Sequence, residues 1–113
     1  MSGGGTNDTA LRIVDNAAVS RYEALLGKEL VGFSEYRALR DRRVFVHTEV
    51  DERYEGLGYG RLLIKAALDD ARTRGLKVTP ICPFMAAYIK RHPEYDDLVS
   101  WGRRPPGAKA RGG

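Results

Sequence analysis

A glycine-rich turn between an apolar segment and a helical pattern is the stretch of the sequence best suited to chemistry. The apolar run Val44–Val50 is followed by Glu55-Gly56-Leu57-Gly58-Tyr59-Gly60, and the helical pattern begins directly after it. Three glycines at alternate positions let bare backbone approach a ligand, and free N–H groups at a helix start attract anions. The pattern therefore predicts a pyrophosphate cradle on the amides of Leu57, Gly58, Tyr59, Gly60 and Arg61. The simpler alternative is a tight turn that begins a helix.

Two common nucleotide-binding motifs do not fit this turn. The dinucleotide motif G-x-G-x-x-G requires a third glycine where this chain has Arg61. A P-loop counted from Gly56 requires a glycine at the same position, followed by Lys-Ser or Lys-Thr, which are absent. The phosphorylated ligand is therefore expected to be of another class.

The turn resembles the cofactor loop of the GNAT acetyltransferases, which runs Arg/Gln-x-x-Gly-x-Gly/Ala and holds the pyrophosphate of acetyl-CoA. Together with His47-Thr48-Glu49-Val50, Cys82, Tyr88 and Pro93, it is similar to the small stand-alone GNAT-like proteins of the Yjdj type, over residues 10–100. The resemblance implies an N-acetyltransferase that moves an acetyl group from acetyl-CoA to an amine by direct attack. The short chain suggests an open acceptor site, which would suit a protein or peptide lysine.

The resemblance also implies roles for individual residues. It makes Glu49 the general base, Tyr88 the proton donor to the departing CoA thiolate, and Cys82 a thiol near the cofactor sulfur that could accept the acetyl group. The resemblance also implies that Val50, Cys82 and the loop Leu57–Arg61 bind the cofactor. The chain has Glu55 where the family has Arg or Gln, so we expect Arg53 or Arg61 to supply the positive charge.

Each of these residues also has a structural interpretation. Glu49 could bond the glycine loop or Arg53, and His47 on the same strand face could be structural too. Tyr88 could pack in the core, and an unpaired cysteine such as Cys82 is usually a small core residue. Glu55 favours a second function, an acyl-CoA-binding module with little or no catalysis. A nucleic-acid partner is not expected, because only Trp101 offers an aromatic ring beside the basic tail.

The expected fold is α/β, an antiparallel meander followed by a β-helix-β unit whose central strands splay apart. The predicted strands are Leu11–Val14, Arg21–Leu26, Glu29–Leu39, Arg43–Val50 and Lys77–Cys82, and the helices are Gly60–Arg74 and Ala86–Pro93. Simple alternation in the fourth strand places Val44, Val46, Thr48 and Val50 on one face, and Phe45, His47 and Glu49 on the other. Pro80 cannot donate to a ladder, so it indicates either the splay or a sheet edge.

Composition limits the remaining possibilities. The chain has 113 residues, 42% of them hydrophobic, and a net charge of +4, which suit one globular domain. We expect tails at 1–9 and 102–113 around a domain at 10–101. A single cysteine cannot form an internal disulfide, and no segment is apolar enough to span a membrane, so a cytoplasmic location is expected. The two histidines and the cysteine match no zinc spacing.

Overall fold

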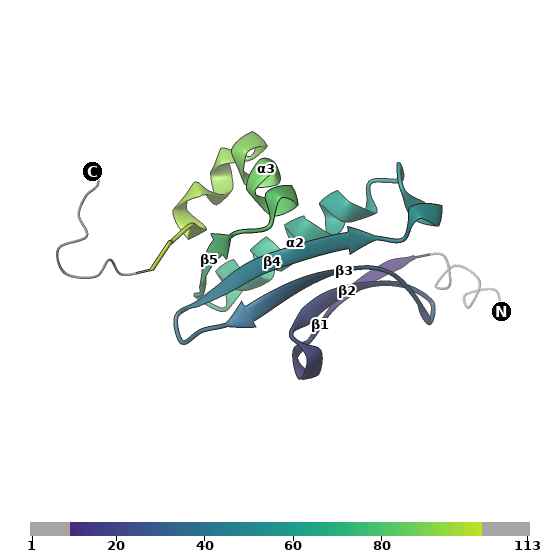
Figure 1. Ribbon diagram of the computed structural model, residues 1–113, viewed down its shortest axis with the longest axis horizontal. Helices are drawn as coiled ribbons and strands as arrows, with labels where there is room; N and C mark the ends of the chain where they lie inside the picture. Colours follow the sequence, from purple (N-terminus) through teal and green to yellow (C-terminus); the bar gives the residue numbers. More distant parts are fainter. Residues whose placement is uncertain (1–9, 103–113) are drawn as a thin grey trace.

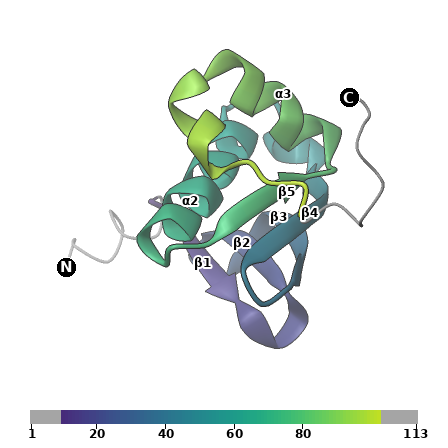
Figure 2. The ribbon, with the colours of Figure 1, turned by 90° about the vertical axis from the view of Figure 1, so that its left-hand side faces the viewer.

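The computed structural model describes residues 10–102 and shows one five-stranded sheet with its helices packed on one face (Figures 1 and 2). The strands follow one another across the sheet in chain order: β1 (Leu11–Asn16), β2 (Arg21–Leu26), β3 (Glu29–Ala38), β4 (Arg42–Val50) and β5 (Lys77–Pro80). The first four are antiparallel, and β5 runs parallel to β4. The expected meander and β-helix-β unit are confirmed. The expected tail 1–9 and, apart from Gly102, the expected tail 102–113 lie outside the described residues.

Helix α2 (Tyr59–Thr73) joins β4 to β5 and covers the sheet. Its buried residues recur at helical spacing and form one apolar stripe: Gly60, Leu63, Ile64, Ala67, Leu68 and Ala71. Gly75 follows the helix with φ of +72°, in the left-handed region that favours glycine at a helix end. The helix is therefore specified by its own sequence at both its apolar face and its C-terminal end.

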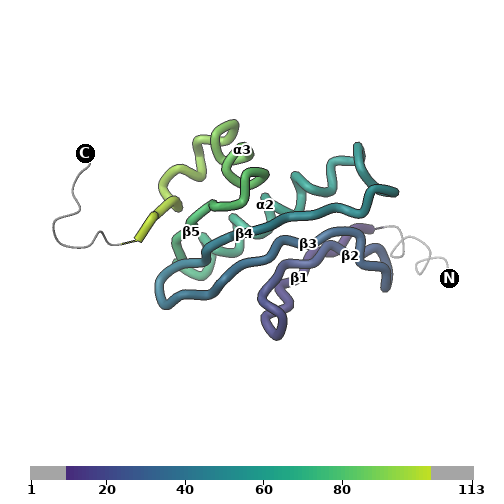
Figure 3. Tube along the Cα trace, in the orientation of Figure 1, coloured from purple at the N-terminus to yellow at the C-terminus, as the bar shows by residue number. Residues whose placement is uncertain are grey.

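Helix α3 (Pro83–Arg91) packs beside α2 and against β4 and β5, and the path of the chain can be followed in Figure 3. It begins three residues earlier than the predicted helix Ala86–Pro93, because Pro83 supplies a favourable first helical residue. A 3₁₀ segment, Pro93–Leu98, follows and brings Tyr95 and Leu98 into the core. No helix among residues 10–102 is long and apolar enough to span a membrane.

Strand β4 contains a bulge that changes which side chains share a face. Glu35 pairs with His47 but Tyr36 pairs with Phe45, so Val46 is an extra residue in β4. Phe45 and Thr48 therefore lie on the same face, the one covered by the helices, where Thr48 bonds the fully buried Ser34. The predicted simple alternation, with Phe45 opposite Thr48, is wrong because one inserted residue reverses it.

Strands β4 and β5 part after a short paired region. They pair from Arg42 and Lys77 to Phe45 and Pro80, and the Cys82 amide then donates to the Phe45 carbonyl at 2.8 Å. Beyond that bond, β4 continues to Val50 paired with β3 but no longer with β5, so the expected splay is confirmed. Strand β5 is also the last strand of the sheet. Pro80 therefore lies both at the splay and at a sheet edge, the two positions that its missing N–H indicated. The strand ends at Pro80, two residues earlier than predicted.

Candidate functional site

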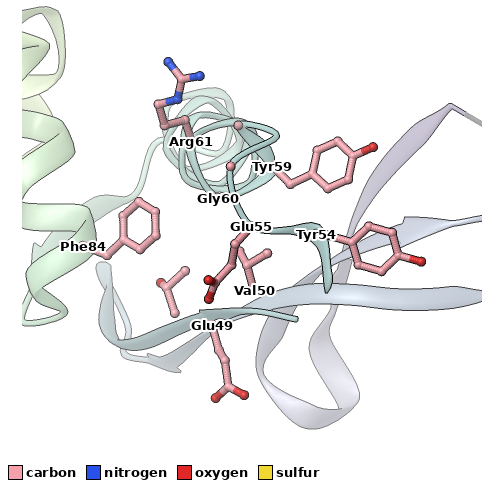
Figure 4. Close-up of a pocket in the computed structure, with 11 residues that line it drawn as sticks. Glu49, Val50, Tyr54, Glu55, Tyr59, Gly60, Arg61 and Phe84 are labelled. Carbon is pink, nitrogen blue, oxygen red and sulfur yellow. The ribbon is translucent and has the colours of Figure 1, made fainter. Parts of the chain in front are cut away.

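A pocket of about 580 Å³ lies where the free half of β4, the part beyond Phe45 that no longer pairs with β5, faces the start of α2 (Figure 4). Its walls come from the end of β4, the glycine loop, the first turn of α2 and the start of α3. The lining residues are Thr48, Glu49, Val50, Tyr54, Glu55, Gly56, Gly58, Tyr59, Gly60, Arg61 and Phe84. The predicted cofactor residues are thus brought together, except for Leu57 and Cys82, which do not line this pocket.

The glycine loop presents bare amides at the start of α2. Gly56 and Gly58 have φ of +85° and +82°, which other residues adopt only with strain. Gly58 is the N-terminal cap, and the first intrahelical bond runs from the Leu62 amide to the Gly58 carbonyl at 3.1 Å. The amides before Leu62 in α2 therefore have no intrahelical acceptor, and neither a side-chain cap nor an acid in the first turn competes for them.

Gly60 serves a different purpose from the other two glycines. A β-carbon at Gly60 would lie 2.6 Å from Cζ of Phe84 and 3.4 Å from Cγ2 of Val50. Its lack of a side chain therefore lets the Phe84 ring and β4 approach the helix start. The sequence pattern placed Gly60 in the cradle but did not identify Phe84, which the structure shows as a wall of the same pocket.

The glycine loop is surrounded by both acidic and basic side chains. Arg53 donates to both Asp51 and Glu29, and its hydrogen bonds hold the pKa of the Asp51 carboxyl below its usual range. Arg61 lies over the loop, with one guanidinium nitrogen 2.8 Å from where a β-carbon on Gly58 would be. Of the two arginines expected to supply charge, Arg61 is thus the one at the pocket. Figure 4 shows the Glu55 side chain directed into the pocket.

Glu49 lies on the opposite face of β4 from Thr48. Its side chain is 60% exposed and accepts a hydrogen bond from His47 Nε2 at 3.0 Å. Figure 4 shows it pointing away from the pocket, although its backbone lines the wall. Glu49 and His47 form an exposed pair on the sheet face that α2 and α3 leave open.

Tyr88 packs between α3 and α2 instead of lining the same pocket. The residue is 8% exposed, and its ring stacks on His92 with ring centres 4.1 Å apart. It lines a second hollow that includes Leu57, Arg61 and Lys65. Burial raises the pKa of the Tyr88 phenol above its usual value.

Cys82 lies where β4 and β5 part. It is 2% exposed, and its Sγ donates to Thr48 Oγ1 at 3.3 Å. Thr48 does line the pocket, so Cys82 is one hydrogen bond away from it. Sequence reasoning did not select Thr48 or Ser34, because single hydroxyl residues in strands carry no spacing signal.

Comparison with known proteins gives the family. The model of the GCN5-related N-acetyl-transferase family matches residues 21–98, which is more than half of the chain. The chain therefore belongs to the GCN5-related N-acetyl-transferase family, and the resemblance to the GNAT acetyltransferases is confirmed. No match was found among the curated proteins.

One solved structure shows the same fold. The solution structure of a GCN5-like protein from Staphylococcus aureus is 20% identical, with a TM-score of 0.60, and the match covers 97% of this chain and 100% of that one. Ard1 from Thermoplasma volcanium is 25% identical (TM-score 0.47), and the match covers 54% of this chain and 43% of Ard1. Ribosomal-protein-alanine N-acetyltransferase from Brucella melitensis biovar Abortus 2308 is 19% identical (TM-score 0.49), with 80% and 68% covered. The first of these shows the fold; the other two scores are too low to add to it.

Proposed function

We propose that the chain is an acetyl-CoA-dependent N-acetyltransferase that acts by direct attack of an amine on the thioester. The observation that supports this most is the set of uncapped amides at the start of α2, beside the splay of β4 and β5, in a member of an acetyltransferase family. Backbone N–H groups at a helix start bind pyrophosphate oxygens without a dedicated cation. The site therefore suits a phosphorylated acyl donor.

The donor is proposed to lie along the pocket from the loop to the splay. The pyrophosphate would contact the amides of Leu57–Arg61, with the Arg61 guanidinium adding positive charge close to the loop. The pantetheine arm would pass Val50 and end beside Thr48, a lining residue that bonds Cys82 where β4 and β5 part. Acetyl-CoA supplies the activated acyl group, and the protein supplies position and proton handling.

The amine is proposed to arrive from the open face of the sheet. Glu49 and His47 lie on that face, along the part of β4 that has left β5. At neutral pH an alkyl amine is protonated and cannot attack, so a base must first take its proton. We assign that role to Glu49. Tyr88 lines the adjoining hollow and not this pocket, so we propose only a lesser role for it as acid. A thiolate with a reference pKa of about 8.5 is already a fair leaving group.

The exposure of Glu49 and His47 also bears on the acceptor. A protein or peptide lysine can reach an exposed pair on an open sheet, whereas a small molecule would find few walls to hold it. We therefore propose a protein or peptide amine as the acceptor. A cytoplasmic location, inferred from the single cysteine, is part of the same proposal.

The second candidate is an acyl-CoA-binding module with little or no catalysis, which the acidic Glu55 in the pocket favours. Calorimetry with acetyl-CoA, followed by thiol release with a panel of peptide lysines and free N-terminal amines, separates the two. Binding with release supports the enzyme, and binding without release on any amine supports the module. A folded Gly58→Asp variant, which puts a negative charge in the cradle, is the control and should bind weakly.

A further inference from the structure

Three small polar side chains, two from neighbouring strands and one from the segment after β5, meet beside the pocket at the point where β4 and β5 part. Ser34 of β3 and Thr48 of β4 have their hydroxyl oxygens 2.8 Å apart. Cys82, just after β5, donates from its thiol to Thr48 Oγ1 at 3.3 Å. Ser34 and Cys82 are 0% and 2% exposed, whereas Thr48 also lines the pocket. Thr48 is thus the point where this buried group reaches the ligand space.

The fold brings the three together through two backbone features. The extra residue Val46 in β4 turns Thr48 toward the covered face, opposite Ser34. The bond from the Cys82 amide to the Phe45 carbonyl, at 2.8 Å, fixes Cys82 at the point where the strands part. The group therefore sits at the closed end of the splay, where the pocket can hold the reactive end of a donor.

The hydrogen bonds around Thr48 Oγ1 bear on where the Thr48 hydroxyl proton points. The 2.8 Å contact allows either hydroxyl to donate. Within residues 10–102 Ser34 Oγ has no hydrogen-bond partner other than Thr48 Oγ1, so we assign Ser34 as the donor, which is the arrangement that gives its buried proton an acceptor. The Cys82 thiol also donates to Thr48 Oγ1. A hydroxyl oxygen has two lone pairs and one proton. With both lone pairs used, the Thr48 proton is left to point toward the pocket.

We propose that Thr48 is the hydrogen-bond donor to the thioester sulfur, an inference that rests on the proposed function. In this arrangement the pantetheine arm of acetyl-CoA lies on the covered face of the sheet, the same face as Thr48. The amine approaches from the open face, where Glu49 lies. The thioester sulfur is therefore the reacting atom nearest to Thr48. The amine nitrogen forms a bond to the carbonyl carbon, and the carbon–sulfur bond breaks with its electron pair going to sulfur. Before the attack, Glu49 takes the ammonium proton and, being exposed, passes it to solvent. The second nitrogen proton, released as the amide forms, then goes to Glu49. Thr48 donates a hydrogen bond to the thiolate and keeps its own proton.

The test compares binding of CoA with binding of desulfo-CoA, which lacks the sulfur. One hydrogen bond predicts that the wild-type chain binds CoA about 2- to 10-fold more tightly. Thr48→Val keeps the shape but removes the hydroxyl, so it should bind both ligands equally, and Thr48→Ser should restore the preference. Thr79→Val is the matched control, because Thr79 is a buried threonine on β5 that bonds Ser100 and does not line the pocket.

Each outcome decides between the two proposals. Equal binding by Thr48→Val, with the preference kept by Thr48→Ser and Thr79→Val, supports the sulfur contact. An unchanged preference in a folded Thr48→Val overturns it while leaving acetyl transfer intact. A wild-type chain that binds neither ligand overturns both. As a second readout, Thr48→Val should lower kcat for acetyl transfer with little change in KM, because a contact to the departing sulfur strengthens as charge develops there.

Discussion

Replacing Gly58 by alanine separates the ligand role of the loop from its folding role. Gly58 has φ of +82°, so a β-carbon there costs about 1–2 kcal/mol of folding free energy. That β-carbon would also lie 2.8 Å from a guanidinium nitrogen of Arg61, which would have to move. Gly75, at the other end of α2, has φ of +72°, and a β-carbon added there would meet no atom within 4 Å, so Gly75→Ala is the matched control.

Both variants should lose about 1–2 kcal/mol of unfolding free energy in urea titrations, because both force a side chain into the left-handed region. Only Gly58→Ala should weaken acetyl-CoA binding in calorimetry. Losing one amide contact to a charged phosphate costs about 1.5–3 kcal/mol, which is about a 10- to 150-fold rise in Kd. If the two folded variants bound acetyl-CoA with the same affinity as the wild type, the placement of the pyrophosphate on this loop would be refuted.

Three further results are expected. Glu55→Gln should bind acetyl-CoA more tightly than the wild type in calorimetry, because it removes a negative charge from the pocket, and unchanged or weaker binding would argue against a phosphate beside Glu55. Glu49→Gln should lower turnover by about 10²–10⁴-fold, more than Tyr88→Phe does, and its deficit should shrink as pH rises and free amine becomes abundant; equal, pH-independent losses would remove both roles. Burial and the hydrogen bond to Asp15 raise the pKa of Tyr36 to about 12 from 10, so the unfolded chain ionises first and stability falls as pH rises from 10 to 12. Tyr36→Phe should remove part of that alkaline loss, on the order of 2 kcal/mol, in urea midpoints measured from about pH 8 to about pH 11.5, and an identical pH dependence would contradict this origin.

The parts of the fold that depend on local sequence could be predicted. The bounds of β2 agree with the prediction because the turn Gly27-Lys28 and the alternating apolar residues are both local signals. The bulge at Val46 could not be predicted, because valine suits regular and bulged strands alike and the bulge is set by pairing with β3. That single residue decides whether Thr48 lies on the same face of β4 as Phe45 or on the other face.

The candidate site was also predicted only in the parts that leave a local signal in the sequence. The glycine loop was found because positive φ restricts the residue type, which leaves a mark in the sequence at Gly56 and Gly58. The reason for Gly60 was missed, because it depends on the Phe84 ring from a different helix, distant in the sequence. The hydrogen bond of Thr48 to Ser34 was missed for the same reason, since it requires the strand register.

An amide NMR titration with acetyl-CoA tests the central claim most directly. The account predicts saturable shifts that are largest at the amides of Leu57–Arg61, with further shifts at Thr48 and Val50 along the free half of β4. Ser20, in the turn between β1 and β2, is remote from the pocket lining and should not respond. A folded chain that showed no shifts at Leu57–Arg61, or saturable shifts only elsewhere, would contradict acetyl-CoA binding at this loop.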